Sequence, residues 1–122
     1  MKNVIDNEAR QAHFDVAALD ALKEVMEDEF SVLVTAFIAD SGARLVAMKY
    51  ALKSNDLNVL RDIAHSFKGV AGNLCTVELA ELCFKIEQQA REGRTVGLQE
   101  LLSQTETEHL AVKTHLLAMI KG

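Results

Sequence analysis

The clearest pattern along the chain is a run of apolar positions spaced three and four residues apart between residues 57 and 74. This spacing places side chains on one face of an α-helix. The face consists of Leu57, Leu60, Ala64, Phe67, Ala71 and Leu74. At about 100° per residue, His65 points roughly 150° away from the centre of the apolar face. We therefore expect the imidazole of His65 to be exposed.

Similar repeats predict other helices on both sides of this segment. We expect a short N-terminal helix at about residues 15–26, capped by Asp15, and long helices at about 29–53 and 96–120. Another helix runs between Thr76, a candidate N-cap, and Gly93, a candidate stop signal. Residues 1–14 are polar and are expected to begin as irregular chain. These elements predict an all-α fold, an antiparallel up-and-down four-helix bundle over about 29–120 with the short N-terminal helix added.

The predicted helix at 29–53 is unusual because its first half is apolar nearly all round. Its main face consists of Phe30, Leu33, Phe37, Leu45, Met48 and Leu52. Val32, Ala36 and Ala39 add apolar positions on the other sides. Such a helix is usually covered on two sides, here by the bundle and the short first helix. The alternative is that part of it is exposed beside His65 and docks a partner.

Composition and charge narrow the class of protein. With 122 residues, no proline and 49% hydrophobic content, the chain is expected to form a single helical domain over residues 1–122. A net charge of −5 argues against a nucleic-acid partner. No apolar run approaches the roughly 20 residues of a membrane span, and no signal peptide is recognisable. We expect a cytoplasmic monomer with two reduced thiols, Cys75 and Cys83.

Two glycines on the helix at 57–74 single out His65. Gly69 and Gly72 are expected inside the helix, where each costs about 1 kcal/mol relative to alanine. Neither is expected at a helix end or on the apolar face. Because helical side chains lean toward the N-terminus, a side chain at position 69 would cover the surface around His65. The glycines therefore indicate that a second molecule must reach the imidazole.

The chemistry of this surface favours phosphoryl transfer. A neutral imidazole nitrogen is a competent nucleophile near neutral pH. Lys68, one helical turn along, could place an ammonium group beside the negative charge of a phosphoryl group on His65. Nothing nearby forms a metal site, and Glu106-x-x-His109 lacks the second copy that a di-iron site requires. His109 is interpreted as a hydrogen-bonded structural residue, and His13 and His115 as surface residues.

The segment from Ala64 to Gly72, AHSFKGVAG, resembles the core motif of histidine-containing phosphotransfer (HPt) domains, His-x-x-Lys-Gly followed by small residues. The resemblance covers about residues 15–120 and continues through Leu79, Leu82, Ile86 and Glu87. The family usually has another glycine ten residues after the histidine, where this chain has Cys75. That difference puts the local geometry at Cys75 in question.

The resemblance implies a phosphocarrier of a two-component phosphorelay. His65 would accept a phosphoryl group from the aspartate of one receiver domain and pass it to another receiver. Glu87 would orient the imidazole, and Arg61 and Arg91 would join Gly69 and Gly72 in the docking surface. The receiver would supply Mg²⁺, so this chain is expected to bind no cofactor or metal. It has no nucleotide-binding loop, so we expect no autonomous kinase or phosphatase activity.

Two other classes of protein remain as alternatives. The dimerisation domain of a histidine kinase also presents a histidine on a helical bundle, but it usually has an acidic residue where this chain has Ser66. It also requires an attached ATP-binding domain. A helical adaptor without chemistry would leave the glycines beside His65 unexplained. For Glu87 and Arg91, the alternative interpretation is a solvated, salt-bridged helix surface.

Overall fold

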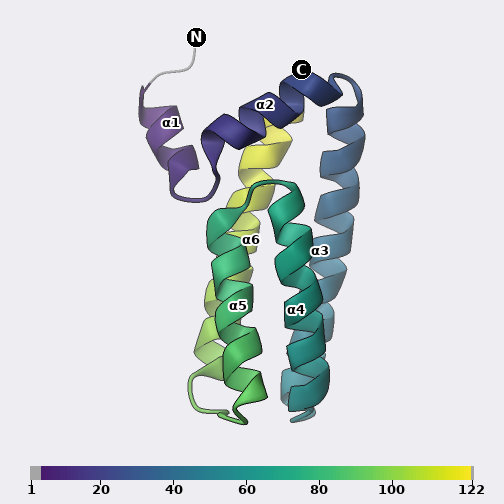
Figure 1. The fold of residues 1–122 in the computed structure, drawn as a ribbon, viewed down its shortest axis with the longest axis vertical. Coiled ribbons are helices and arrows are strands. Elements are labelled where there is room, and N and C mark those ends of the chain that lie inside the picture. Colours follow the sequence, from purple (N-terminus) through teal and green to yellow (C-terminus); the bar gives the residue numbers. More distant parts are fainter. Residues whose placement is uncertain (1–3, 122) are drawn as a thin grey trace.

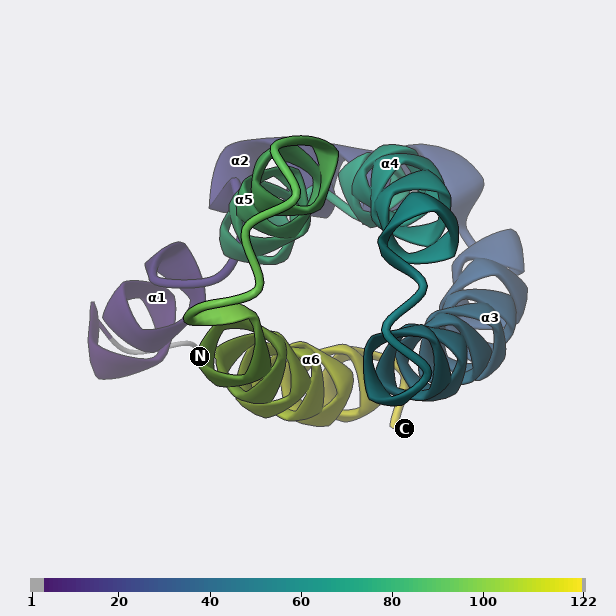
Figure 2. The ribbon, with the colours of Figure 1, turned by 90° about the horizontal axis from the view of Figure 1, so that it is seen from below.

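The structure, a computed structural model, describes residues 4–121, and those residues form six α-helices. The helices are α1 (Val4–Gln11), α2 (Val16–Met26), α3 (Glu29–Lys53), α4 (Leu57–Asn73), α5 (Val77–Arg91) and α6 (Leu98–Ile120). Helices α3 to α6 alternate in direction and form a closed bundle in which α6 packs against both α5 and α3 (Figures 1 and 2). Helix α2 lies across one end of the bundle (Figure 1). The all-α, four-helix-bundle prediction is confirmed.

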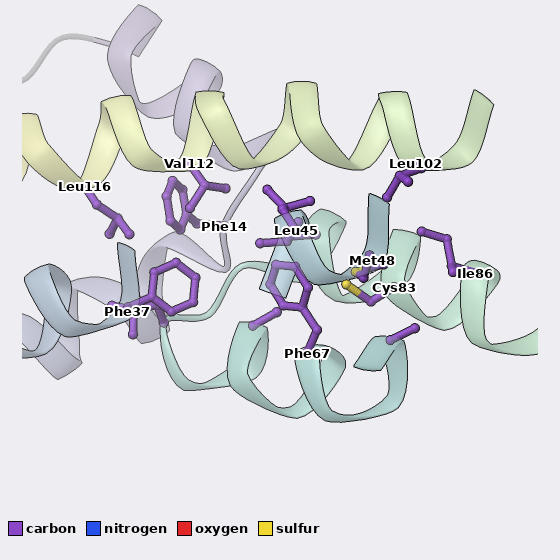
Figure 3. Close-up of a cluster of buried hydrophobic side chains, with 14 of the residues drawn as sticks. Phe14, Phe37, Leu45, Met48, Phe67, Cys83, Ile86, Leu102, Val112 and Leu116 are labelled. Carbon is purple, nitrogen blue, oxygen red and sulfur yellow. The ribbon is translucent and has the colours of Figure 1, made fainter. Parts of the chain in front are cut away.

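One apolar core fills the space between the four long helices (Figure 3). Phe67 of α4 lies near its centre together with Met48 of α3 and Cys83 of α5. Phe14, which precedes α2, is buried in the same core close to Val112 of α6 (Figure 3). Burial of such large apolar side chains is the main favourable contribution to folding, so the core fixes the faces that the helices turn outward.

Local signals place the helix ends within two residues of the predicted positions. The Asp15 carboxylate accepts a hydrogen bond from the Ala18 amide at 3.2 Å and caps α2. Asp56 caps α4 in the same way through the Val59 amide at 3.1 Å. Thr76 behaves differently from expectation, because its hydroxyl donates to the carbonyl of Ala71 instead of capping α5.

Helix α1 occupies part of the segment that was expected to be irregular, so that expectation is wrong for residues 4–11. The helix is short and polar, and its stability depends on tertiary contacts rather than on an apolar repeat. Arg10 is buried, and its guanidinium forms an ion pair with Asp20 of α2 at 2.6 Å. The amides of His13 and Phe14 both donate to the Arg10 carbonyl, and these bonds close the turn into α2.

Helix α3 is covered on one side only, which corrects the prediction that it is sandwiched. Its buried face consists of Phe30, Val34, Phe37, Ser41, Leu45, Met48 and Ala51. Leu33 and Leu52 are only half-buried, while Val32 and Ala36 on the opposite side are exposed. Among the described helices, α3 alone has the length and apolar composition of a membrane span, contrary to the expectation that no segment does. A long helix that packs along the core of a bundle can have the same length and apolar composition as a membrane span.

The histidines outside α4 are all engaged with other side chains. His109 is buried and its Nε2 lies 2.7 Å from Ser41 Oγ, which confirms the structural role expected for it. Burial lowers the pKa of His109 below its ordinary value. His13 was expected at the surface, but it is half-buried and its Nδ1 lies 2.7 Å from Glu108 Oε2. The ring of His115 stacks 5.3 Å from that of His13, so it is not simply solvated either.

The turn between α2 and α3 contains a strained residue that a substitution can relieve. Glu27 has a φ of +50°, a conformation that favours glycine, and its side chain is exposed. We expect Glu27→Gly to stabilise the protein by about 1 kcal/mol and to raise the melting temperature by about 3–5 °C. Asp28→Gly is the matched control, because Asp28 is also acidic and exposed but has a φ of −65°. Thermal unfolding should show the control destabilised, and an equal effect at both positions would contradict the strain argument.

Candidate functional site

His65 is the exposed centre of the site. Its neighbours Ala64 and Phe67 are fully buried against the bundle, and their positions turn the intervening side chain of His65 outward. The His65 side chain is 69% exposed, as the apolar pattern predicts. The imidazole therefore stands on the outer surface of α4, where a second macromolecule can reach it.

Glu87 of α5 contacts the imidazole of His65 from the buried side. Its side chain belongs to the buried face of α5, with Cys83 one turn before it, and only 3% of Glu87 is exposed. Glu87 Oε2 lies 2.8 Å from His65 Nδ1. An ionised carboxylate can only accept a hydrogen bond, so Nδ1 carries the hydrogen and Nε2 holds the free lone pair. The contact expected from the resemblance is present, and the alternative of a solvated glutamate is wrong.

The Glu87 carboxylate is shared among three cationic or potentially cationic side chains. Lys68 Nζ donates to Oε1 at 2.9 Å, and Arg91 Nη2 donates to Oε2 at 3.1 Å, in addition to the His65 contact. Burial raises the pKa of the Glu87 carboxyl, but hydrogen bonds from Lys68 and His65 outweigh burial and hold the pKa below its ordinary value. Glu87 is therefore a permanent anion directly beneath the imidazole at neutral pH.

Lys68 sits between Glu87 and an aromatic side chain that the sequence analysis did not single out. The Lys68 ammonium lies 5.2 Å from the centre of the Phe84 ring, and Phe84 is partly exposed. Phe84 precedes Glu87 by three residues, a spacing that places both on the same side of α5, and this spacing could have identified it. The ammonium is thus held within one helical turn of His65 before any phosphoryl group is present.

Gly69 and Gly72 follow His65 by one and two turns on the same side of α4, and both have open space where a side chain would begin. A Cβ atom built on either glycine would meet no other atom within 4 Å. Neither glycine is therefore required by packing within this chain. Gly72 lies one residue before the end of α4, and its carbonyl accepts a hydrogen bond from the Cys75 amide at 3.1 Å. The expectation that neither glycine lies at a helix end is wrong for Gly72.

Cys75 adopts the left-handed conformation in the turn between α4 and α5, with a φ of +60°. This geometry answers the question raised by the sequence, since the position at which the family usually has glycine is one where glycine is the least strained residue. The Cys75 carbonyl accepts a hydrogen bond from the Asp15 amide at 2.9 Å. The turn therefore also anchors the start of α2 to the bundle.

The remaining predicted docking residues lie on the same side of the molecule or close to it. Arg91 is more than half exposed while it binds Glu87, so it is not merely solvated, and its place in a docking surface stays a prediction. Arg61, one turn before His65, forms a loose ion pair with Asp62 at 3.4 Å. Its membership of a docking surface stays a prediction, because it contacts none of the other site residues.

The described residues 4–121 contain no group of three or more histidine, cysteine, aspartate or glutamate side chains arranged to hold a metal ion. Glu106 pairs with Lys49 of α3 at 2.8 Å, while His109 Nε2 lies 2.7 Å from Ser41 Oγ. The chemistry available at His65 is thus that of a nucleophilic nitrogen, a buried carboxylate and two flexible cations.

Comparisons with known proteins agree with this geometry. Residues 32–120 match the family model of the Hpt domain. The crystal structure of histidine-containing phosphotransfer protein B (HptB) from Pseudomonas aeruginosa PAO1 is similar, with a TM-score of 0.84 and 39% sequence identity over 88% of this chain and 93% of that chain. No curated protein sequence matches the chain. With an exposed histidine on a four-helix bundle and a family match over most of its length, the chain belongs to the Hpt domain family.

Proposed function

We propose that the chain accepts a phosphoryl group on Nε2 of His65 from the aspartyl phosphate of one receiver domain and passes it to the aspartate of another. Family membership supports the general role of phosphotransfer carrier in a phosphorelay. The observation that carries the specific proposal is the pairing of an exposed imidazole with a buried carboxylate at 2.8 Å. A surface histidine without a role has no need of a buried, ionised partner.

The proposed transfer is a single displacement at phosphorus. The Nε2 lone pair of His65 forms a bond to phosphorus while the bond from phosphorus to the aspartyl oxygen breaks and returns the receiver's carboxylate. Nδ1 keeps its proton, so the phosphorylated ring carries a positive charge that the Glu87 carboxylate stabilises. The reverse displacement, with a second receiver's carboxylate as the nucleophile, regenerates the neutral imidazole.

Lys68 stabilises the phosphoryl oxygens in this proposal. Its ammonium bonds to Glu87 before transfer and can turn toward the new negative charge on the neighbouring turn of the helix. Arg91 remains on Glu87 and keeps the carboxylate ionised after Lys68 has moved. In the phosphorylated protein, Lys68 thus stabilises the charge of the phosphoryl group, and Arg91 stabilises the charge of the Glu87 carboxylate.

The partner receiver domain completes the reaction. It brings the aspartyl phosphate, an acidic pocket and Mg²⁺, and Gly69 and Gly72 leave room for its approach. This proposal requires no nucleotide and no metal on the chain itself. The carrier is expected to have neither kinase nor phosphatase activity of its own.

Incubation with a phosphorylated receiver domain separates the three candidate classes. A phosphocarrier gains an acid-labile, base-stable label without ATP. A helical adaptor gains no label from any receiver, and a histidine-kinase fragment gains label from ATP only when its ATP-binding domain is added. Failure to gain label from any receiver of the source cell would contradict the proposed function.

Replacing Glu87 tests whether it positions the imidazole. We expect Glu87→Leu to lower the transfer rate by roughly 10- to 100-fold, the range seen when carboxylates that orient metal-binding histidines are removed. Glu87→Gln, which keeps a hydrogen-bond acceptor, should lose less. Nitrogen NMR of the His65 ring provides a structural readout, because only the variant with leucine should lose the preference for a hydrogen on Nδ1. An unchanged ring tautomer in Glu87→Leu would contradict the positioning role.

A further inference from the structure

Arg44 of α3 reaches across to the turn of α4 that carries His65. Its Nη1 donates a hydrogen bond at 2.5 Å to Oγ of Ser66, the residue that directly follows His65. Because consecutive Cα atoms are about 3.8 Å apart, this contact places Nη1 no more than roughly 9 Å from the Cα atom of His65. The Arg44 side chain is 27% exposed, so it lies along the junction of α3 and α4 and does not extend into solvent.

The Arg44 side of His65 is also the side on which Gly69 leaves open space. At about 100° per residue, Ser66 and Gly69 are turned from His65 in one direction around α4, and Lys68 is turned in the other. The contacts of α4 identify these directions, because Ser66 contacts α3 and Lys68 contacts α5. Helix α4 lies between those two helices (Figure 2). A molecule that approaches the imidazole over Gly69 therefore comes in over Arg44.

The size of a protein interface leads to the same conclusion. An interface of ordinary size buries about 800 Å² on each partner, and a round patch of that area extends about 16 Å from its centre. A transient interface of half that area still extends about 11 Å. A receiver domain that reaches His65 therefore also covers the Arg44 guanidinium.

The hydrogen bonds of Arg44 indicate which group should cover it. A guanidinium carries five N–H donors. Within residues 4–121, Nε donates to the Asp40 carboxylate at 2.7 Å and Nη1 donates to Ser66, which leaves three N–H groups without an acceptor. An apolar surface placed over these donors would leave them desolvated and unpaired, at a cost in binding free energy. A carboxylate matches the planar fork of a guanidinium best.

We propose that Arg44 is a docking residue that binds a carboxylate of the incoming receiver domain and so helps to determine which receivers the chain accepts. This inference rests on the proposed function, in which the receiver brings an acidic pocket to His65. Arg44 complements that acidic surface on the α3 side of the imidazole, while Lys68 and Arg91 lie on the α5 side. Ser66 and Asp40 hold the guanidinium in place before the receiver arrives, which lowers the entropic cost of binding.

Transfer rates measured over a series of concentrations of a phosphorylated receiver domain test the proposal. We expect Arg44→Gln to raise KM roughly 10- to 100-fold and to leave kcat nearly unchanged, because a docking contact acts on binding and not on the chemical step. Lys49→Gln is the matched control. It removes a positive charge from the same helix, but Lys49 pairs with Glu106 of α6 at 2.8 Å, so its KM should equal that of the wild type.

The failure of this proposal can be told apart from the failure of the proposed function. A wild-type chain that gains no label from any receiver would contradict the proposed function. A wild type that is labelled, together with an Arg44→Gln variant of unchanged KM, would overturn the docking role of Arg44 alone.

Two further measurements separate docking from a purely structural role in which Arg44 braces α3 against α4. Bracing acts through Ser66, so Ser66→Ala would then raise KM as much as Arg44→Gln does. Docking predicts a smaller effect, because Ser66→Ala retains the guanidinium. Docking also predicts that KM rises more steeply with NaCl concentration in the wild type than in Arg44→Gln, and that Arg44→Lys restores this salt dependence by restoring the charge. Equal effects of Ser66→Ala and Arg44→Gln, or equal salt dependence in the wild type and Arg44→Gln, would overturn the proposal.

Discussion

His65→Gln is expected to abolish phosphoryl acceptance and to leave the fold intact. Glutamine has no nucleophilic nitrogen, so no bond to phosphorus can form at this position. The His65 side chain is mostly exposed, and substitutions at exposed positions usually change stability by less than about 0.5 kcal/mol. Lys68 and Arg91 would continue to pair with the Glu87 carboxylate. The measurement is acid-labile label after incubation with a phosphorylated receiver, together with circular dichroism and thermal unfolding.

The other histidines provide the controls for this prediction. His109 is buried against Ser41, and His13 and His115 contact each other, so none of them offers a free surface like that of His65. His115→Gln should therefore retain the full label. Label that persists in His65→Gln would show that another histidine is the acceptor.

Gly69→Leu is expected to change stability and transfer in opposite directions. Leucine is favoured over glycine inside a helix by about 1 kcal/mol, and a Cβ at position 69 meets no other atom within 4 Å. The protein should therefore become more stable. The new side chain would lean over His65 and displace an incoming receiver, and displacement of reacting groups by about 1 Å can cost roughly 100-fold in rate. We expect a transfer rate lowered by about that factor.

Gly42→Leu separates the gain in helix stability from the loss of receiver docking. Gly42 is also a helical glycine with open space around its Cβ position, but it lies on α3. This variant should gain similar stability and transfer phosphoryl groups at the wild-type rate. Wild-type transfer by Gly69→Leu would show that the space above His65 has no role in docking.

Much of the fold could be predicted from the sequence because the local signals agree with the tertiary structure. Helices α2 to α5 begin and end within about a residue of the expected positions, owing to capping by Asp15 and Asp56 and to the left-handed Gly93 after α5. Gly97, also left-handed, delays the start of α6 to Leu98. The outward direction of His65 followed directly from the 3.6-residue period.

The features that could not be predicted depend on contacts between distant segments. Helix α1 is held by the Arg10–Asp20 ion pair rather than by an apolar repeat. Glu87 is buried as deeply as the apolar residues of the core. Its desolvation is offset by donors from other residues, and no local sequence pattern reveals those contacts. The open outer side of α3 was offered only as the alternative to a helix covered on two sides, because an apolar surface that is exposed has the same sequence pattern as one that is covered.

The central claim is that Nε2 of His65 receives the phosphoryl group while Nδ1 keeps its hydrogen bond to Glu87. Nitrogen and phosphorus NMR of the chain, labelled at its histidine rings and phosphorylated by a receiver domain, tests this claim directly. We predict coupling between phosphorus and Nε2 of His65, with a proton retained on Nδ1. Coupling to Nδ1 of His65, or to a ring nitrogen of any other histidine, would contradict it.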